Sequence, residues 1–402
     1  MPTPDSLSVS DPVSEVVTER FDPRPIASHA RGGPKMLFFS GGSALDGLSR
    51  RLKDHTCNSI HLMTPFDSGG SSAVLRRVFD MPSLGDIRQR LLALSDGSDE
   101  PIKLLQSLLG HRLAVELPNS ELRQQLQAMA AGTDDRMAAL PASPRSVVAR
   151  HLTTVLELLP KDTDLRGASI GNLVLAGSYI GSGNDLDATL SDISHLLNVR
   201  GTVRAIVNDN LQLGVKLKNG QTVVGQHLIT GKEHPAIDVP IDSVFLTDSP
   251  VGEADAVQAK LDPGKSDLIA AADLICFGPG SFFSSLVANV LPEGVGRAVA
   301  ANPCPKVWIP NLGFDPEQLA MGFGETLQQL LTPLRRDHPA AAAKAMVSHV
   351  IVDSDWARSC TGEISGVLGG LDIQHLELPL VTDNSAPYYD DARLLDALLS
   401  LL

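Results

Sequence analysis

The chain has 402 residues, of which 43% are hydrophobic and only 4% aromatic, and it carries a formal net charge of −14. This composition indicates a globular protein with a large aliphatic core, and the acidic balance argues against nucleic acid as a main partner. No stretch approaches the roughly 18 consecutive apolar residues of a membrane-spanning helix, so no membrane partner is expected. The polar N-terminus and four cysteines without paired spacing predict a cytoplasmic protein.

The first part of the chain divides into a tail and two similar units. Residues 1–33 are rich in Pro, Ser and charged residues, and we predict that they form a mobile tail. Residues 34–402 are expected to form a single domain. It begins with two strand–loop–helix units, with strands predicted over 35–39 and 59–63 and helices over 45–52 and 73–79.

The middle of the chain contains two predicted insertions. Residues from about 97 to 165 are expected to be wholly helical. A further amphipathic helix is predicted over 186–197. After it the hydrophobic pattern changes to period two, with an Asn-Gly turn at 219–220, which predicts an antiparallel β insertion at about 201–247.

The last part returns to apolar runs typical of buried strands, over 272–277, 306–309 and 349–352. Strands that alternate with helices are typical of a mostly parallel sheet covered on both faces. The predicted fold is therefore α/β: a Rossmann-like, mostly parallel sheet flanked by helices, with a small antiparallel β insertion.

Three glycine-bearing loops follow predicted strands, and ligands of open α/β sheets collect at the carboxyl ends of strands. The first loop contains Gly41, Gly42 and Ser43. Glycines let backbone N–H groups approach phosphate oxygens, and the following helix offers the positive end of its dipole. A tight turn that holds no ligand explains this loop equally well.

The second loop combines a carboxylate, Asp67, with Gly69, Gly70, Ser71 and Ser72. Asp67 is a candidate ligand for a hard cation such as Mg²⁺, and the serine hydroxyls can donate to phosphate. The alternative is that these residues only cap the start of a helix.

The third loop contains Gly278, Gly280 and Ser281 around Pro279. Two glycines beside the free N–H groups of a helix start favour an anion-binding loop over a merely rigid turn.

Two further side chains are candidates for the same site. Arg88 is the preferred cation to neutralise a diphosphate, although arginines in this region can also lie on solvated helix faces. Asn172 begins an apolar segment, where a buried amide needs a partner that is either backbone or ligand. The histidines show no spacing that would suggest a zinc site. No nucleophile elbow, P-loop or dinucleotide fingerprint occurs, which argues against hydrolase, P-loop ATPase and ordinary dehydrogenase functions.

Taken in order, these motifs resemble the family of 2-phospho-L-lactate transferase (CofD) and the gluconeogenesis factor (YvcK), over roughly residues 35–385. The matching segments are Ser40-Gly41-Gly42, Asp67-Ser68-Gly69-Gly70-Ser71-Ser72, Leu75-Arg76-Arg77, Gly85-Asp86-Ile87-Arg88, Gly171-Asn172-Leu173 and Gly278-Pro279-Gly280-Ser281. The antiparallel insertion also fits the gluconeogenesis-factor branch.

The resemblance implies a ligand that joins a nucleoside diphosphate to another group. In the transferase branch a guanylylated phospholactate donates phospholactate to a deazaflavin with Mg²⁺, and in the other branch UDP-sugars are bound for regulation. By position, Asp67 would be the metal or acceptor-side carboxylate. Gly278, Gly280 and Ser281 would contact the diphosphate, and Asn172 would face the nucleotide pocket.

The sequence departs from the family pattern in the first two loops. Ser43 follows the glycine pair where a third glycine is usual, and Ser68 stands where the family has a second aspartate. A shared metal site would therefore lose one charge, and deazaflavin is not expected as the acceptor. The chain resembles a divergent, CofD-like branch.

Two functions remain open at this point. The first is a CofD-like transferase that takes a phosphoryl-linked group from a nucleoside-diphosphate donor with Mg²⁺, using Asp67 and Arg88. The alternative is a non-catalytic regulator that binds UDP-sugars. A nicotinamide-dependent oxidoreductase ranks last. The base, the transferred group, the acceptor and the number of subunits, homo-oligomers included, stay open.

Overall fold

The computed structural model describes residues 32–231, 234–250, 255–360 and 363–402. The predicted tail, residues 1–33, lies outside these ranges except for its last two residues. Seven strands in the described part form one parallel sheet in the order β10-β9-β8-β7-β1-β2-β3, as the sequence predicts for a Rossmann-like fold. Their bounds are β1 Met36–Ser40, β2 Ile60–Met63, β3 Thr202–Ala205, β7 Leu274–Phe277, β8 Lys306–Trp308, β9 His349–Asp353 and β10 Gln374–Leu378.

The central strands are buried on both faces of the sheet. Every residue of β1 and β7 is buried. Phe39 of β1 stacks on Phe277 of β7 with ring centroids 5.4 Å apart. Strands covered on both faces are continuous apolar runs, and this is why the runs 35–39 and 272–277 predict strands correctly.

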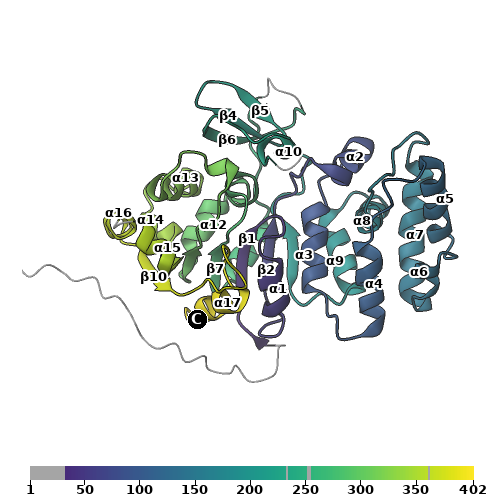
Figure 1. The fold of residues 1–402 in the computed structure, drawn as a ribbon, viewed down its shortest axis with the longest axis horizontal. Coiled ribbons are helices and arrows are strands. Elements are labelled where there is room, and N and C mark those ends of the chain that lie inside the picture. Colours follow the sequence, from purple (N-terminus) through teal and green to yellow (C-terminus); the bar gives the residue numbers. More distant parts are fainter. Residues whose placement is uncertain (1–31, 232–233, 251–254, 361–362) are drawn as a thin grey trace, which may run out of the picture.

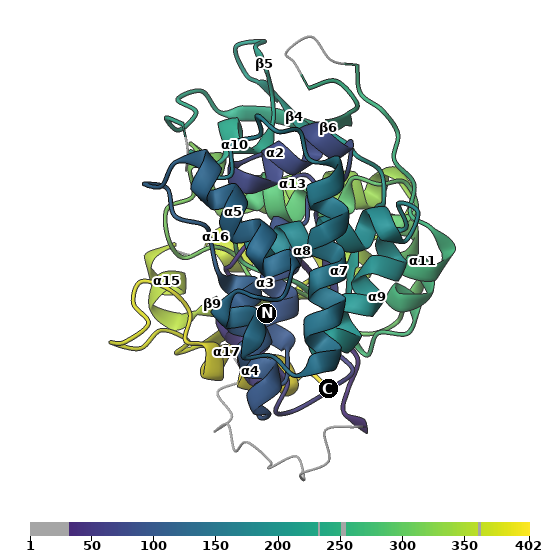
Figure 2. The same cartoon turned by 90° about the vertical axis from the view of Figure 1, so that its right-hand side faces the viewer.

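Helices cover both faces of the sheet and form a separate layer beyond β2 (Figure 1). Figure 2 looks onto this layer, in which α7 and α8 pack together. Gly177 permits their close approach, because a methyl group there would lie 2.0 Å from the carbonyl oxygen of His151. The helices before β3 are α1 Asp46–Leu52, α2 Gly70–Phe79, α3 Gly85–Leu94, α4 Glu100–Gly110, α5 Asn119–Ala130, α6 Asp135–Ala138, α7 Ala142–Leu158, α8 Ile170–Gly181 and α9 Leu186–Leu196. The later helices are α10 Gln226–Ile229, α11 Pro263–Ala270, η2 Phe282–Leu286, η3 Val287–Val290, α12 Val295–Ala301, η4 Pro316–Gln318, α13 Phe323–Arg336, α14 Ala343–Met346, α15 Ser354–Ser359, α16 Glu363–Leu371 and α17 Asp391–Leu399.

The antiparallel insertion is smaller than the sequence predicts. It consists of β4 Gln212–Leu217, β5 Thr222–Val224 and β6 Ile241–Thr247, in the order β5-β4-β6. The predicted insertion at 201–247 wrongly includes β3, which pairs in parallel with β2 at the edge of the main sheet. An edge strand buries only one face, so β3 alternates in burial as an antiparallel strand does, and period two does not distinguish the two cases.

The small sheet and α10 sit above the carboxyl ends of β1 and β2 (Figure 1). Two C-terminal elements, β10 and α17, were not predicted from the sequence. Leu394, Leu395 and Leu398 of α17 pack against Leu45 and Leu48 beside β1. No helix in the described ranges is long and apolar enough to cross a bilayer.

Candidate functional site

The candidate site lies at the carboxyl edge of the sheet. Here β1 stands between β2 and β7, so the strand order reverses between β1 and β7, which is where open α/β sheets bind ligands. We name the loops at this edge by the strand they follow: loop A is residues 41–45 after β1, loop B is 64–69 after β2, loop C is 278–281 after β7, and loop D is 309–322 after β8.

Loops A and C are in direct contact. A methyl group at Gly278 would lie 2.7 Å from Leu45 Cδ1, and one at Gly280 would lie 3.3 Å from Ala44 Cβ. Gly280 also has a positive φ of 138°. Glycine at both positions therefore allows the two backbones to meet, and the structure brings together the first and third loops singled out in the sequence.

Loop A is held from three sides. A methyl group at Gly41 would lie 2.8 Å from Ser285 Cβ and 3.0 Å from Thr64 Oγ1. Gly42 has a φ of 53°, and its N–H donates to Asp86 Oδ2 over 2.8 Å. Ser43 is exposed at the tip of the loop.

The amides of loop C and of the following helix are already bonded to side chains of loop D. Gly280 N–H donates to Asn311 Oδ1 over 2.8 Å, and Phe282 N–H donates to Asp315 Oδ2 over 2.8 Å. The N–H groups of Phe283 and Ser284 both donate to Glu317 Oε2, over 2.7 and 2.8 Å. Carboxylates of the protein thus occupy the helix start that the sequence suggested for an anion. Ser281 stands at the N-cap position of this helix, but its side chain makes no capping hydrogen bond.

Glu317 is the most buried of these carboxylates, with 1% of its surface exposed. Burial and the nearby charge of Asp315 raise the pKa of Glu317 to about 7. The hydrogen bonds that Glu317 accepts from Ser284 and Phe283 lower this pKa, but they do not cancel the increase. The unfolded chain loses this proton near pH 4.5 and the folded protein near pH 7, so the unfolded state binds fewer protons between these values.

We therefore expect Glu317 to make the free energy of unfolding fall as pH rises from about 4.5 to about 7. The fall should be on the order of 1–3 kcal/mol, since one pKa unit corresponds to about 1.4 kcal/mol. Urea unfolding of the wild type and of Glu317→Gln at several pH values measures this fall. The variant should lack it, because glutamine does not titrate. Parallel pH profiles for the two proteins would contradict the assignment.

Loop B is fixed by contacts on both sides. The Asp67 carboxylate accepts from Gly69 N–H over 3.0 Å. Ser68 Oγ lies 2.7 Å from Nδ1 of His227 in α10, which ties the loop to the small sheet. Arg76 donates to the carbonyl oxygens of Phe66 and Asp67 over 3.2 and 3.0 Å.

Loop B reaches loop A through the first turn of α3. A methyl group at Gly85 would lie 2.6 Å from Ser72 Oγ and 3.0 Å from Asp67 Oδ2. The next residue, Asp86, bonds Gly42. The first turn of α3 thus lies against Asp67 of loop B through Gly85 and bonds loop A through Asp86.

The remaining predicted residues lie toward α8, next to what we call the helical cavity. This cavity of about 240 Å³ is lined by residues that include Gly70, Ser71, Arg112 and Ser169. Asn172, 2% exposed, donates to Ser71 Oγ over 3.1 Å.

Arg88 lies behind this cavity and not at loops A and C. It is 5% exposed and donates to Ser169 Oγ. Burial and the neighbouring Arg112 lower the pKa of Arg88 to about 10, which leaves it a cation at neutral pH.

Several polar groups at this edge have no internal partner. Among the described residues, Thr64 Oγ1, Asn172 Oδ1 and Asn289 Oδ1 are buried without a hydrogen bond. Asn289 also donates to the carbonyl of Ser40, over 2.8 Å, so it borders loop A. Within the described ranges no group of three or more His, Cys, Asp or Glu residues is placed to hold a metal ion.

Comparison with known proteins assigns the family. The family model described as "2-phospho-L-lactate transferase CofD" matches residues 36–361. The chain belongs to the CofD family. This confirms the resemblance noted in the sequence.

Relatives of this CofD-family protein include gluconeogenesis factors. The chain is 31% identical to the gluconeogenesis factor of Bacillus subtilis (strain 168) over 294 residues, which are 73% of this chain and 70% of the relative. It is 28% identical to a putative gluconeogenesis factor of Clostridium acetobutylicum over 71% of this chain, but it spans only 49% of that longer relative. Two crystal structures of a Bacillus halodurans protein share the fold, with TM-scores of 0.66 and 0.65 at 24% identity over 92% of this chain.

Sequence reasoning missed the side chains that close the loops in this CofD-family protein. Asp86 was named only as part of a matching segment and was given no role in the site, and Asn311, Asp315 and Glu317 were not considered. Loop D follows the predicted strand 306–309, so the rule that sites gather at the carboxyl ends of strands could have found it. No sequence signal pairs His227 with Ser68, which are 159 residues apart.

Proposed function

We propose that this protein binds a nucleoside-diphosphate-linked ligand at the edge of the sheet where loops A and C meet, and that it transfers a phosphoryl-linked group with the help of Mg²⁺. The observation that carries the proposal is the contact of loops A and C at the switch point of the sheet. The unpartnered oxygens of Thr64 and Asn289 beside loop A also favour a polar ligand. The name of the family supports transfer of a phosphorus-containing group.

Mg²⁺ fits this arrangement as an ion that the ligand helps to hold. It is commonly bound by one or two carboxylates, with substrate phosphates and waters as the other ligands. Asp67, assisted by Asp86, would supply the carboxylates.

Transfer would then depend on positioning and charge, without a covalent nucleophile. Arg88 would add positive charge from the α8 side. The helical cavity, with Gly70, Ser71 and Asn172 at its edge, would hold the acceptor.

Regulation without turnover is the second candidate function. The hydrogen bonds between backbone amides at loops A and C and protein carboxylates favour it. A phosphate that took the amides of Gly42, Phe283 and Ser284 would displace Asp86 and Glu317. Ligand binding would therefore rearrange loop D and report the level of a nucleotide sugar. The gluconeogenesis factors among the relatives agree with this role.

One experiment separates the two functions. The protein is incubated with UDP-sugars or a GDP-linked donor, with and without Mg²⁺, while its melting temperature and the release of UMP or GMP are measured. A ligand at 100 times its Kd should stabilise the folded state by about 2.7 kcal/mol. Stabilisation with product indicates a transferase, and stabilisation alone indicates a regulator.

Asp67→Ala is expected to lose the Mg²⁺-dependent part of this stabilisation, whereas Glu100→Ala, which removes an exposed carboxylate on α4, should behave as wild type. If no nucleotide-linked compound shifts the melting temperature, the proposed function is wrong.

A further inference from the structure

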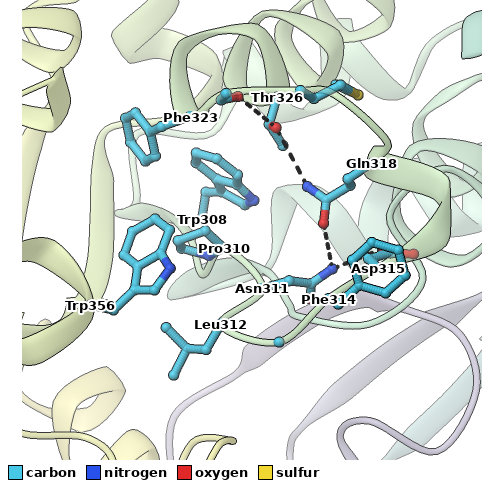
Figure 3. A pocket seen from close by; sticks show the side chains of 13 residues that line it. Trp308, Pro310, Asn311, Leu312, Phe314, Asp315, Gln318, Phe323, Thr326 and Trp356 are labelled. Atoms are coloured by element: carbon cyan, nitrogen blue, oxygen red, sulfur yellow. Dashed lines mark hydrogen bonds between the residues drawn. The ribbon is translucent and has the colours of Figure 1, made fainter. Parts of the chain in front are cut away.

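A second cavity lies beside loop C, and we name it the aromatic cavity. It has a volume of about 280 Å³ and extends from the end of β8 to α15. Its lining includes Trp308, Phe314, Phe323 and Trp356, although aromatic residues make up only 4% of the sequence (Figure 3). Such a concentration of rings in a hollow favours a ligand that is itself flat.

One wall of the aromatic cavity is a run of packed rings. Trp308 and Phe323 have ring centroids 5.3 Å apart, and Phe323 and Trp356 have centroids 6.2 Å apart. Trp308 is 1% exposed, yet its indole N–H has no hydrogen bond to any described residue, and in Figure 3 it is turned toward the polar side of the cavity. Because buried Trp N–H groups normally have a partner, this donor is available to a ligand.

The opposite wall is polar and belongs to loop D. Asn311 donates to Gln318 Oε1 over 2.9 Å, and Gln318 Nε2 lies 3.4 Å from Thr326 Oγ1 (Figure 3). Phe314 lines the same cavity with 84% of its surface exposed, so one of its faces is free for stacking.

Asn311 joins the aromatic cavity to the proposed diphosphate site. Its Oδ1 accepts from Gly280 N–H over 2.8 Å, and its Nδ2 donates to Gly280 O over 2.7 Å. The cavity lies one to two strands from the β1–β7 switch point, which is about 5–10 Å at the usual strand spacing. A diphosphate at loop C would therefore direct the group attached to it into the cavity.

We infer that the aromatic cavity binds the base and ribose of the nucleotide ligand. This inference rests on the proposed function, since it assigns one end of the same ligand. A base stacks on aromatic faces, and its edge offers hydrogen-bonding groups to the Trp308 N–H and the Gln318 and Thr326 side chains. At about 280 Å³ the cavity is at the lower limit of small-molecule sites, so it accommodates one nucleoside and not a whole nucleotide sugar.

The tryptophans make the inference directly measurable. The chain has only two, Trp308 and Trp356, and both line the cavity. UDP or GDP with Mg²⁺ should change the tryptophan emission, while pyrophosphate and glucose 1-phosphate should not. Phe314→Ala should weaken the nucleotide roughly tenfold and leave the affinity for pyrophosphate unchanged. Because Phe314 is exposed, the variant is expected to fold, and Leu158→Ala, which removes an exposed apolar side chain at the end of α7, is the control.

The outcomes separate this inference from the proposed function. If nucleotides raise the melting temperature but leave the emission and the Phe314→Ala affinity unchanged, the base lies elsewhere and the proposed function stands. An emission change by glucose 1-phosphate alone would assign the cavity to the sugar and overturn the inference. If neither nucleotides nor pyrophosphate bind, both proposals fail.

Discussion

Replacing Gly280 with valine is expected to lower the affinity for a nucleoside-diphosphate-linked ligand by at least about 100-fold, which corresponds to roughly 2.7 kcal/mol. A methyl group at this position already lies 3.3 Å from Ala44 Cβ, so a larger side chain fills the space where loops A and C meet. Isothermal titration of the wild type and the variant with UDP or GDP and Mg²⁺ measures the loss.

The matched control is Gly183→Val. Gly183 also has a positive φ, 73°, but it is exposed and a side chain there meets nothing within 4 Å. Both variants carry the backbone strain of a branched residue at positive φ, on the order of 1–3 kcal/mol. Only Gly280→Val should lower the affinity for the nucleotide. Equal affinities of the two variants would show that loops A and C do not form the ligand site.

Arg90→Met is expected to destabilise the fold by about 3–5 kcal/mol. Arg90 is fully buried beneath loop A, where it donates to Leu45 O over 2.8 Å, to Ser49 Oγ and to Gly42 O over 3.3 Å. Asp46 lies 3.8 Å from it. Burial raises the pKa of Asp46, and Arg90 opposes this shift, so the removal of Arg90 leaves a half-buried carboxyl without the arginine that pairs with it.

Urea unfolding followed by circular dichroism measures this loss. Arg50→Met is the control, because Arg50 is exposed on α1 and a surface substitution of this kind typically changes stability by less than about 0.5 kcal/mol. A similar midpoint for Arg90→Met and wild type would contradict the prediction and show that the buried guanidinium contributes little to stability.

The sequence identified those parts of the site that depend only on residues adjacent in the chain. A buried strand followed by a glycine turn is a local pattern, so β1, β7 and loops A and C were placed correctly from apolar runs and glycines. The period-two pattern at the start of the predicted insertion 201–247 correctly indicated a strand there, but not the partner of that strand. Alternation reflects burial of one face and carries no information on pairing.

The closing contacts of the site depend on residues far apart in the chain. Gly42 bonds Asp86, 44 residues later, and Phe283 bonds Glu317, 34 residues later. In the sequence the first amides of a helix look free, and only the folded chain shows which carboxylates reach them.

By itself the sequence determined the fold class, the family resemblance and the glycine loops, since these follow from hydrophobic periodicity and short motifs. The tertiary structure alone decided that loops A and C touch, that Arg88 faces α8, and that both tryptophans line one cavity. The physical reason is that strand order and helix packing bring together segments with no local relation, and the free energy of these contacts belongs to the whole fold.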